Sequence, residues 1–307
     1  MKKQEWIWQD GKLIEKEKAV LHVLSHGIHY GTGAFEGIRC YKTPQGFAIF
    51  HLEEHVKRLF YSIKPFKAKV DFLEKEISAA IVETVKKNLS AFSSESDSIY
   101  IRPLAICKTD KLRISPQGAE MSFFIACWPW GKYLSSKPIK VNLSSYIRIH
   151  PRSTICDAKI CGHYVNSVLS TIESHEKGFD ESLLLDFKGN IAEGPGENFF
   201  MIKKGQISTP PLGNILAGIT RQSIIEMAKK EFDLEIKEKE ITLKEAQEAD
   251  ELFFTGTAAE ITAIGQLEDQ LINQGKEGPI TQKLREKFFN IVTGKEKNYQ
   301  QWLTYVN

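Results

Sequence analysis

The segment 157–166 contains a lysine that could act as a nucleophile. Lys159 stands between Ala158 and Ile160, just before the expected start of a helix. Because small and apolar neighbours partly desolvate an amine, they lower its pKa and make it nucleophilic enough to form a Schiff base. Tyr164 follows near enough in the sequence to share the same site. Most lysines are solvated surface residues, so this segment by itself favours that simpler interpretation.

Two later segments contain groups that could hold the ring and the phosphate of a cofactor. In Glu193-Gly-Pro-Gly-Glu-Asn198, a stiff loop could fix the Glu193 carboxylate against a pyridine nitrogen and keep that nitrogen protonated. In Leu216-Ala-Gly-Ile-Thr220, the N–H groups at a helix start could bind a phosphate. The simpler alternatives are a loop that enters a strand and an ordinary threonine N-cap. Together with the lysine, the acid and the N–H groups fit the parts of pyridoxal phosphate (PLP).

Two weaker signals concern anion binding. The segment 253–260 ends a strand in a turn of small residues, whose backbone N–H groups could form a second anion site. Arg58 lies on the first long predicted helix but off its apolar stripe. Its guanidinium is therefore either solvated or available for a bidentate phosphate contact. Many strand ends and helix faces look like these, so neither signal is specific alone.

Polar residues on an apolar strand indicate a possible substrate contact. Tyr100 and Arg102 alternate along the strand predicted at 98–107, which places both side chains on one face. Buried polar groups need partners, and either a carboxylate substrate or a buried ion pair would satisfy these two. His26 and His29 have a spacing that suits a metal, but no further histidine or acidic cluster accompanies them. We therefore expect no metal site.

The elements expected to position these residues mix helices and strands without a regular βαβ alternation. An Asp10-Gly11 turn predicts an N-terminal hairpin. Strands are expected at 33–41, 47–50, 98–107, 120–128, 139–147, 182–187, 197–202 and 251–255. Helical periodicity predicts helices from Leu52 up to Pro65 and at about 71–89, 160–177, 220–231, 242–248 and 280–293. This pattern indicates an α+β or irregular α/β fold.

The length of 307 residues suggests two domains. The segment 128–138 contains Pro, Gly and Ser without periodicity, which is typical of a linker. It divides the chain into a smaller N-terminal α/β domain, residues 1–127, and a larger C-terminal domain, residues 139–307.

The composition argues against several functional classes. The net charge of +2 gives no basic field, so nucleic acid is not an expected partner. Five widely spaced cysteines without a Cys-x-x-Cys pair argue against a disulfide framework or a zinc site and favour a reducing cytosol. The start of the chain lacks an apolar signal core, and no run approaches the roughly 18–20 apolar residues that span a bilayer. We therefore expect a cytoplasmic protein without membrane association.

Taken together, the motifs resemble those of branched-chain amino acid aminotransferases, which are class IV aminotransferases of PLP fold type IV. The similar blocks run over almost the whole chain in the family's order, at 25–32, 35–41, 100–104, 129–133, 158–159, 193–198, 218–221 and 256–262. So many blocks in one order are far more specific than any single motif. The resemblance implies a two-domain fold-type IV architecture whose larger domain anchors PLP.

The resemblance implies roles for the residues around the cofactor. Lys159 would be the catalytic residue, forming the Schiff base with PLP and then moving a proton between the substrate's α-carbon and the cofactor. Glu193 would pair with the pyridine nitrogen, and Tyr164 would hydrogen-bond the cofactor's ring oxygen. The phosphate would be held by Arg58, Ile219, Thr220 and Thr257, with Gly218 and Gly256 beside them.

The resemblance also implies a substrate site. The Tyr100 hydroxyl and the N–H groups of Thr257 and Ala258 would bind the α-carboxylate, and Arg102 would bind the distal carboxylate of glutamate. One pocket would then accept both a branched alkyl group and a carboxylate. Its other lining residues would be Tyr30, Phe35, Gly37, Arg39, Trp130, Tyr133, Tyr164 and Ala259.

The implied reaction moves the amino group between L-leucine, L-isoleucine or L-valine and 2-oxoglutarate, giving branched 2-oxo acids and L-glutamate. Within the same fold, D-amino acid aminotransferase and aminodeoxychorismate lyase share the lysine, the glutamate and the phosphate sites. Tyr100, Arg102 and the block 35–39 favour the branched-chain enzymes. A non-catalytic PLP-binding protein is a further alternative, which the intact Lys159 and Glu193 argue against.

The family forms homodimers in which a loop of one subunit covers the site of the other. We expect a homodimer or higher homo-oligomer here, with residues 108–118 as that loop. Arg113 stands in it where a glycine is usual, and this added charge bears on the substrate range. His163 precedes Tyr164 where the family more often has an asparagine, which changes the surroundings of that tyrosine.

Overall fold

The computed structural model describes residues 5–92, 96–109, 112–131, 134 and 137–306. They form two compact units: unit 1 is Met1–Gly131, Ala158–Gly162 and Asn290–Asn307, and unit 2 is Lys132–Asp157 and His163–Phe289. Two later segments thus belong to the same unit as the N-terminal part, and one of them carries Lys159. The sequential division at 128–138 stays a prediction, and part of that segment lies outside the described residues.

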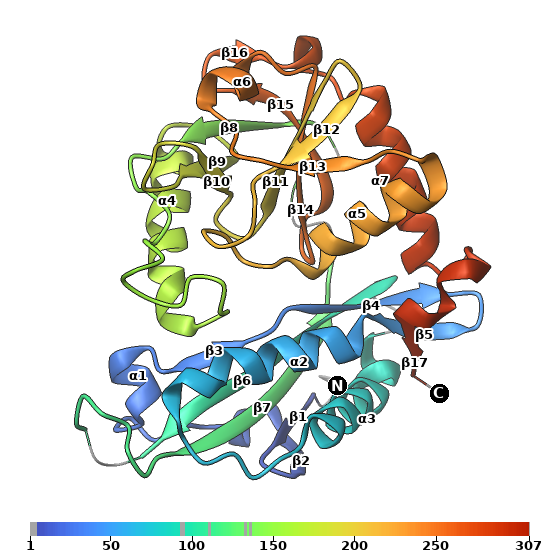
Figure 1. Ribbon diagram of the computed structural model, residues 1–307. Coiled ribbons are helices and arrows are strands. Elements are labelled where there is room, and N and C mark those ends of the chain that lie inside the picture. Colours follow the sequence, from blue (N-terminus) through green and yellow to red (C-terminus); the bar gives the residue numbers. More distant parts are fainter. Residues whose placement is uncertain (1–4, 93–95, 110–111, 132–133, 135–136, 307) are drawn as a thin grey trace. The chain divides into compact units, whose positions relative to one another are not determined.

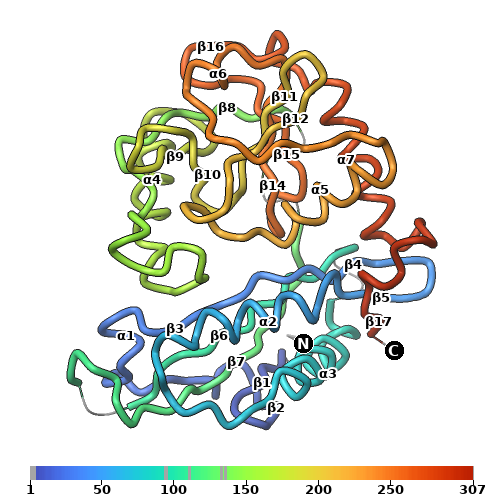
Figure 2. The backbone as a smooth tube through the Cα atoms, viewed as in Figure 1, coloured from blue at the N-terminus to red at the C-terminus, as the bar shows by residue number. Residues whose placement is uncertain are grey.

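The core of unit 1 is an antiparallel sheet with the strand order β17-β5-β4-β6-β7-β1-β2, to which β3 adds by pairing with β6 (Figure 1). Its strands are β1 Trp6–Gln9, β2 Lys12–Glu15, β3 Gly33–Phe35, β4 Ile38–Thr43, β5 Gly46–Phe50, β6 Ser98–Lys108, β7 Glu120–Pro129 and β17 Leu303–Tyr305. β1 and β2 form the predicted hairpin, in which Asp10 and Gly11 both take positive φ. The C-terminal strand β17 lies beside β5, although the two are far apart in the sequence (Figure 2).

Two helices, α2 Leu52–Ile63 and α3 Glu74–Phe92, pack against this sheet. Their apolar residues share one core with the strands, including Val56, Leu59, Ile81 and Phe123. The short helix α1 His26–Tyr30 precedes β3. The prediction for α2 is confirmed, whereas α3 begins at Glu74, later than the predicted start near residue 71.

The strand predicted at 33–41 is interrupted in the structure. β3 ends at Phe35 and β4 begins at Ile38, so Glu36 and Gly37 lie between the two strands. The Glu36 side chain is fully buried and pairs with His55 and Arg58 of α2. The prediction of one continuous strand was wrong. Apolar alternation in the sequence does not reveal that Glu36 points inward, because its partners stand on α2 and not on the strand itself.

The core of unit 2 is a second sheet with the order β10-β9-β8-β15-β14-β11-β12-β13, and β16 pairs with β15. Because β10 also pairs with β11, the strands from β10 to β11 close on themselves as a barrel. The strands are β8 Ile139–Leu143, β9 Glu181–Leu185, β10 Ile191–Glu193, β11 Asn198–Lys203, β12 Gln206–Thr209, β13 Ile236–Glu238, β14 Glu251–Gly256, β15 Glu260–Leu267 and β16 Gln270–Leu271.

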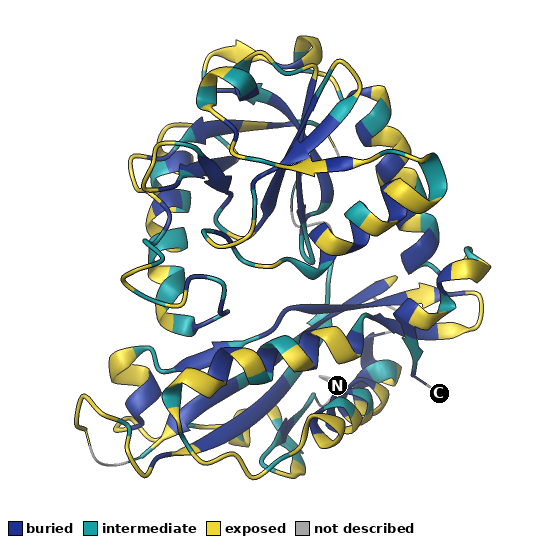
Figure 3. Cartoon of the chain, in the orientation of Figure 1, coloured by how far each residue is buried: buried dark blue, intermediate teal, exposed yellow. Residues whose placement is uncertain are grey.

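The helices of unit 2 are α4 Tyr164–Glu176, α5 Ile219–Phe232, α6 Leu243–Gln247 and α7 Pro279–Val292, the last of which ends in unit 1. All four lie where helices were predicted. α4 begins later than the predicted residue 160, after a 3-10 turn at Cys161–His163, and Lys159 lies before the helix, as expected. Figure 3 shows α4 with mostly intermediate and exposed residues, and the residues buried in it are Ser170 and Ser174.

Among the described residues, no helix is both long and apolar enough to cross a bilayer. Within the same residues, no group of three or more His, Cys, Asp or Glu side chains could hold a metal ion. His26 Nδ1 lies 2.7 Å from Thr32 Oγ1, and His29 Nε2 donates to Val23 O at 2.8 Å, so both histidines have protein partners.

Candidate active site

The backbone of Lys159 is fixed by two elements of unit 1. Its neighbour Ile160 pairs with Ala34 of β3, and the Lys159 carbonyl accepts from Phe35 N at 3.2 Å. The Lys159 N–H donates to Ser62 Oγ of α2 at 2.9 Å. The half-buried side chain places Nζ 5.0 Å from the centre of the Phe35 ring. A lysine on a segment tied to a strand and a helix has a defined direction, as a covalent anchor requires.

An aromatic and cationic wall lies on the same unit. Arg102 donates from a terminal nitrogen to the Tyr100 hydroxyl at 3.1 Å, and its guanidinium lies over the Phe35 ring at 4.5 Å. Tyr100 packs against Trp128 and Trp130 with ring centres 5.1 and 4.7 Å away. The hydrogen bond confirms that Tyr100 and Arg102 share one face of β6. The Nε of Arg102 is buried without a hydrogen-bond partner among the described residues, so this wall retains a donor.

Gly37 has a packing reason to be glycine. A Cβ built on it would lie 2.0 Å from the Tyr100 hydroxyl oxygen and 2.9 Å from the carbon that bears it. Both distances are far inside van der Waals contact, so any side chain here would displace the hydroxyl. The backbone of Gly37 therefore determines where the Tyr100 hydroxyl stands.

Glu36 connects that wall to α2. Arg58 Nε donates to one Glu36 carboxylate oxygen at 2.7 Å, a terminal nitrogen of Arg58 donates to the other at 2.9 Å, and His55 Nδ1 donates to the latter at 2.7 Å. Burial alone would raise the pKa of Glu36, but the positive Arg58 guanidinium above all lowers it well below its usual range. Burial lowers the pKa of His55, although the Glu36 carboxylate opposes this. The Glu36 carboxylate thus holds the Arg58 guanidinium in one orientation.

Sequence reasoning missed Glu36 and His55 and treated Arg58 as solvated or ligand-binding. A signal was present, because His55 and Arg58 are spaced to lie on one face of α2. The acid that they share stands on a distant segment, which no local pattern connects to them. The predicted phosphate contact of Arg58 stays a prediction.

In unit 2, Glu193 ends β10 and is buried. Its carboxylate accepts from Arg148 Nε at 2.5 Å and from the Leu216 N–H at 3.2 Å to each oxygen. A terminal nitrogen of Arg148 also donates to Cys156 O at 3.0 Å. Burial alone would lower the pKa of Arg148, but the Glu193 carboxylate raises it above its usual value. Arg148 therefore stays charged and keeps Glu193 oriented.

Sequence reasoning also missed Arg148. It lies in the segment after β8, with no motif around it, and the short contact to Glu193 joins residues 45 positions apart. Arg148 directly follows the strand predicted at 139–147, and nothing in that stretch indicated a buried cation. The structure ends that strand at Leu143.

The helix predicted at 220–231 corresponds to α5, and the anion site proposed at its start stays a prediction. Gly218 is the N-cap and Ile219 the first helical residue, so Thr220 lies inside the first turn and is not the cap. Gly218 has no side chain to bond the first N–H groups of the helix. These N–H groups and the helix dipole favour a bound anion.

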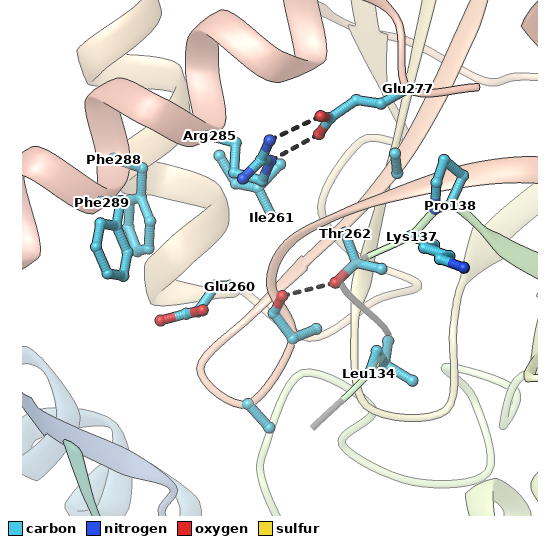
Figure 4. A pocket seen from close by; sticks show the side chains of 13 residues that line it. Leu134, Lys137, Pro138, Glu260, Ile261, Thr262, Glu277, Arg285, Phe288 and Phe289 are labelled. Atoms are coloured by element: carbon cyan, nitrogen blue, oxygen red, sulfur yellow. Dashed lines mark hydrogen bonds and ion pairs between the residues drawn. The ribbon is translucent and has the colours of Figure 1, made fainter. Parts of the chain in front are cut away.

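Gly256 ends β14, and the turn between β14 and β15 contains Thr257, Ala258 and Ala259. The Thr262 hydroxyl donates to Ala259 O at 2.7 Å and fixes this turn from the strand that follows. Figure 4 shows that bond beside a pocket of about 280 Å³ lined by Ala258, Ala259, Thr262 and residues of α7. On the α7 side, Arg285 donates to both carboxylate oxygens of Glu277 at 2.7 Å. The pocket therefore lies against predicted substrate contacts, and its Arg285 charge is already neutralised.

The other predicted site residues that the structure describes lie on α4, on β4 and at the end of α1. Tyr164 is the first residue of α4, and the preceding His163 has Nε2 2.6 Å from Thr154 Oγ1. Arg39 is buried and donates to Ser98 Oγ at 2.8 Å. Tyr30 ends α1 with 42% of its surface exposed. Tyr133 lies outside the described residues.

The loop 108–118 has a link to α1. His26 Nε2 donates to the backbone carbonyl of Arg113 at 2.7 Å, and the His26 ring packs against Tyr30 with centres 4.6 Å apart. Unit 1 thus brings Lys159 and Phe35 together and joins Tyr100 to Arg102. Unit 2 brings Glu193 to the segment that starts α5.

Comparison with known proteins gives a consistent result. The family model for class IV amino-transferases matches residues 33–267 of this chain. A branched-chain-amino-acid aminotransferase of Pseudomonas aeruginosa is 40% identical over 304 residues, or 98% of this chain and 97% of that protein. The crystal structure of a branched-chain aminotransferase from Thermoproteus uzoniensis with norvaline has a TM-score of 0.94 at 39% identity, covering 99% of this chain and 100% of that one. A T.th. branched-chain amino acid aminotransferase complexed with N-(5'-phosphopyridoxyl)-L-glutamate has a TM-score of 0.94 at 40% identity, covering 100% of both chains.

Proposed function

The chain belongs to the amino-transferase class IV family, and we propose that it is a PLP-dependent branched-chain amino acid transaminase. It moves the amino group between L-leucine, L-isoleucine or L-valine and 2-oxoglutarate. The similarity to such enzymes spans nearly the full length of both chains. Two of the similar structures hold norvaline and a phosphopyridoxyl derivative of glutamate, an alkyl and an acidic amino acid.

The donor set of this chain suits PLP. When bound, PLP supplies an electron sink that stabilises negative charge at the substrate's α-carbon. Lys159 provides the amine that attaches the cofactor and moves the proton at that carbon. Glu193, oriented by Arg148, holds the proton on the ring nitrogen. Tyr164 hydrogen-bonds the ring oxygen.

A second group of residues binds the phosphate of PLP. The first N–H groups of α5 have no side-chain cap, which leaves them suited to the phosphate. Arg58, held by Glu36, adds a charged contact. The full phosphate set proposed is Arg58, Gly218, Ile219, Thr220, Gly256 and Thr257.

The pairing of Tyr100 with Arg102 is the observation that carries the substrate assignment. Tyr100, with the N–H groups of Thr257 and Ala258, takes the α-carboxylate. Arg102 lies over the Phe35 ring and has a buried Nε without a partner among the described residues, so it can take the distal carboxylate of glutamate. A branched alkyl group lies against the aromatic rings in the same pocket. The other lining residues proposed are Gly37, Arg39, Tyr30, Trp130, Tyr133 and Ala259.

A substrate panel tests this function against D-amino acid aminotransferase and aminodeoxychorismate lyase. The purified protein is assayed with 2-oxoglutarate and each of L-leucine, L-isoleucine, L-valine and D-alanine, and separately for lyase activity. We expect activity with the three L-amino acids and none in the Lys159→Ala variant. Activity with D-alanine alone, or lyase activity alone, would overturn the assignment.

We further propose that the chain forms a homodimer through α4. Val165, Val168, Leu169 and Ile172 follow helical spacing and are 40–61% exposed, whereas the buried residues of this helix are serines. An apolar stripe directed to solvent is typical of an interface. A second copy of the chain is the partner, as expected for this family, and the interface is isologous.

All five cysteines are free, which supports a reducing, cytoplasmic location.

Light scattering on the size-fractionated protein tests the dimer. The Leu169→Glu variant should elute as a monomer, because it places a charge in the apolar stripe. Leu271→Glu is the matched control, since Leu271 is 56% exposed on β16 and outside that stripe. A Leu169→Glu protein that stays dimeric would contradict the assigned interface.

A further inference from the structure

Asn198 stands where two parts of the candidate cofactor site meet. It begins β11, pairs with Glu193 of β10 and with Thr255 of β14, and is 4% exposed. Its amide nitrogen donates to the second carboxylate oxygen of Glu193 at 3.1 Å and to the carbonyl of Leu216 at 2.9 Å. The Asn198 side chain thus bonds both Glu193, the acid proposed to hold the ring nitrogen, and the segment that leads into α5.

The Leu216 peptide is bound from both ends. Its N–H donates to the two Glu193 oxygens, and its carbonyl accepts from Asn198. Gly218, the N-cap of α5, approaches the other side of the same amide, because a Cβ on Gly218 would lie 1.9 Å from Asn198 Oδ1. A movement of the α5 start therefore moves Leu216, and with it the Glu193 carboxylate.

We infer that Asn198 is a positioning residue that couples the phosphate site at the start of α5 to the acid that holds the ring nitrogen. This inference rests on the proposed function. PLP is rigid between its ring nitrogen and the carbon that carries its phosphate arm, so the two protein sites must keep a fixed separation. A phosphate at the helix start orders the Gly218 backbone, and the Asn198 and Leu216 hydrogen bonds transmit this order to Glu193. Occupation of one end of the site then strengthens binding at the other.

The test separates the two ends of the cofactor. The PLP is removed from the full-length protein, and the Kd of pyridoxal, which lacks the phosphate, is measured with and without saturating inorganic phosphate. In the wild type, phosphate should lower the Kd of pyridoxal by roughly 5-fold or more, the lower end of typical couplings between sites. In Asn198→Leu, which keeps the branched heavy-atom skeleton of the side chain and removes both hydrogen bonds, the two Kd values should be equal.

Two further variants keep the result interpretable. Asn198→Asp retains the shape of the side chain but loses the amide donor, so the phosphate effect should also vanish in this variant. It provides the test if Asn198→Leu does not fold. Asn142→Leu is the matched control, because Asn142 is likewise a buried, hydrogen-bonded asparagine of this barrel, but its partners are Leu143 and Ser174. It should lower the melting temperature and leave the phosphate effect intact.

Either of two results would overturn the inference. One is an unchanged phosphate effect in both Asn198 variants, and the other is a wild type in which phosphate does not change the Kd of pyridoxal. Both can occur in a protein that transaminates L-leucine normally, so they are distinct from a failure of the proposed function. That failure would appear as a wild type without transamination of any branched-chain substrate.

Discussion

Replacement of Gly37 by alanine is a sharp test of the substrate site. The added methyl group would stand 2.0 Å from the Tyr100 hydroxyl oxygen, and tolerable contacts begin beyond 3.0 Å. The hydroxyl must therefore move by roughly 1 Å or more. Gly37 and Tyr100 are both buried, Gly37 between β3 and β4 and Tyr100 on β6, so the backbone has little room to yield.

The expected effect follows from that displacement. A misplacement of about 1 Å in a group that orients substrate reduces the rate by about 100-fold, which is about 2.7 kcal/mol at 1.36 kcal/mol for each factor of ten. Because L-leucine and 2-oxoglutarate both carry an α-carboxylate, kcat/KM should fall by a similar factor for both. A clash with the alkyl pocket alone would instead reduce kcat/KM for L-leucine and spare 2-oxoglutarate.

The assay measures kcat/KM for both substrates in Gly37→Ala, together with its melting temperature and PLP content. Gly131→Ala is the control with the same added methyl group, since no atom lies within 4 Å of the Cβ built there and its φ is not positive. We expect the control to behave as wild type and Gly37→Ala to retain PLP. A kcat/KM within about 3-fold of wild type in folded Gly37→Ala would refute the role of Tyr100, since a 100-fold loss is required.

Three further outcomes are expected. Arg148→Leu leaves the buried Glu193 carboxylate without its cation, so it should lower the free energy of unfolding by about 3–5 kcal/mol and weaken PLP binding, with partial recovery in Arg148→Lys, as urea unfolding and PLP titration would show. Because the pKa of Glu36 is lowered in the fold, its stabilisation is present above the unfolded pKa of about 4.3 and is lost as pH falls below it. Glu36→Gln should therefore melt at a lower temperature at pH 7 and lose less stability than wild type between pH 5 and pH 3, and parallel melting curves would contradict this. Thr262→Val removes the hydrogen bond to Ala259 O, which contributes about 1 kcal/mol to holding the turn at 257–259 in place. Because that turn is proposed to bind the substrate, KM for L-leucine should rise several-fold while kcat stays within about 2-fold of wild type.

Local patterns predicted the elements that carry the site better than they predicted the contacts that orient it. The alternation of Tyr100 and Arg102 placed both on one face of β6, and their hydrogen bond confirms this. The helix at Leu52–Ile63 followed from its apolar spacing. In such cases the signal is contained in a few consecutive residues, so the sequence alone is sufficient.

The orienting contacts join residues that are distant in the sequence. Arg148 bonds Glu193 across 45 positions and Glu36 bonds Arg58 across 22, and neither pair has a local pattern that identifies the partner. The same limit applies to the barrel, since β8 pairs in parallel with both β9 and β15 from far along the chain. The threonine cap considered as the simpler alternative at Thr220 is not formed, because Gly218 caps the helix and a glycine leaves no side-chain signal.

The half-reaction with L-leucine alone tests the proposed transamination most directly. The purified, PLP-loaded protein is mixed with L-leucine in the absence of any oxo acid, and the branched 2-oxo acid released is quantified. We expect about one equivalent per bound PLP, because the amino group stays on the enzyme until 2-oxoglutarate removes it as L-glutamate. No stoichiometric release from L-leucine, or release from D-alanine in its place, would contradict a branched-chain L-amino acid transaminase that uses Lys159.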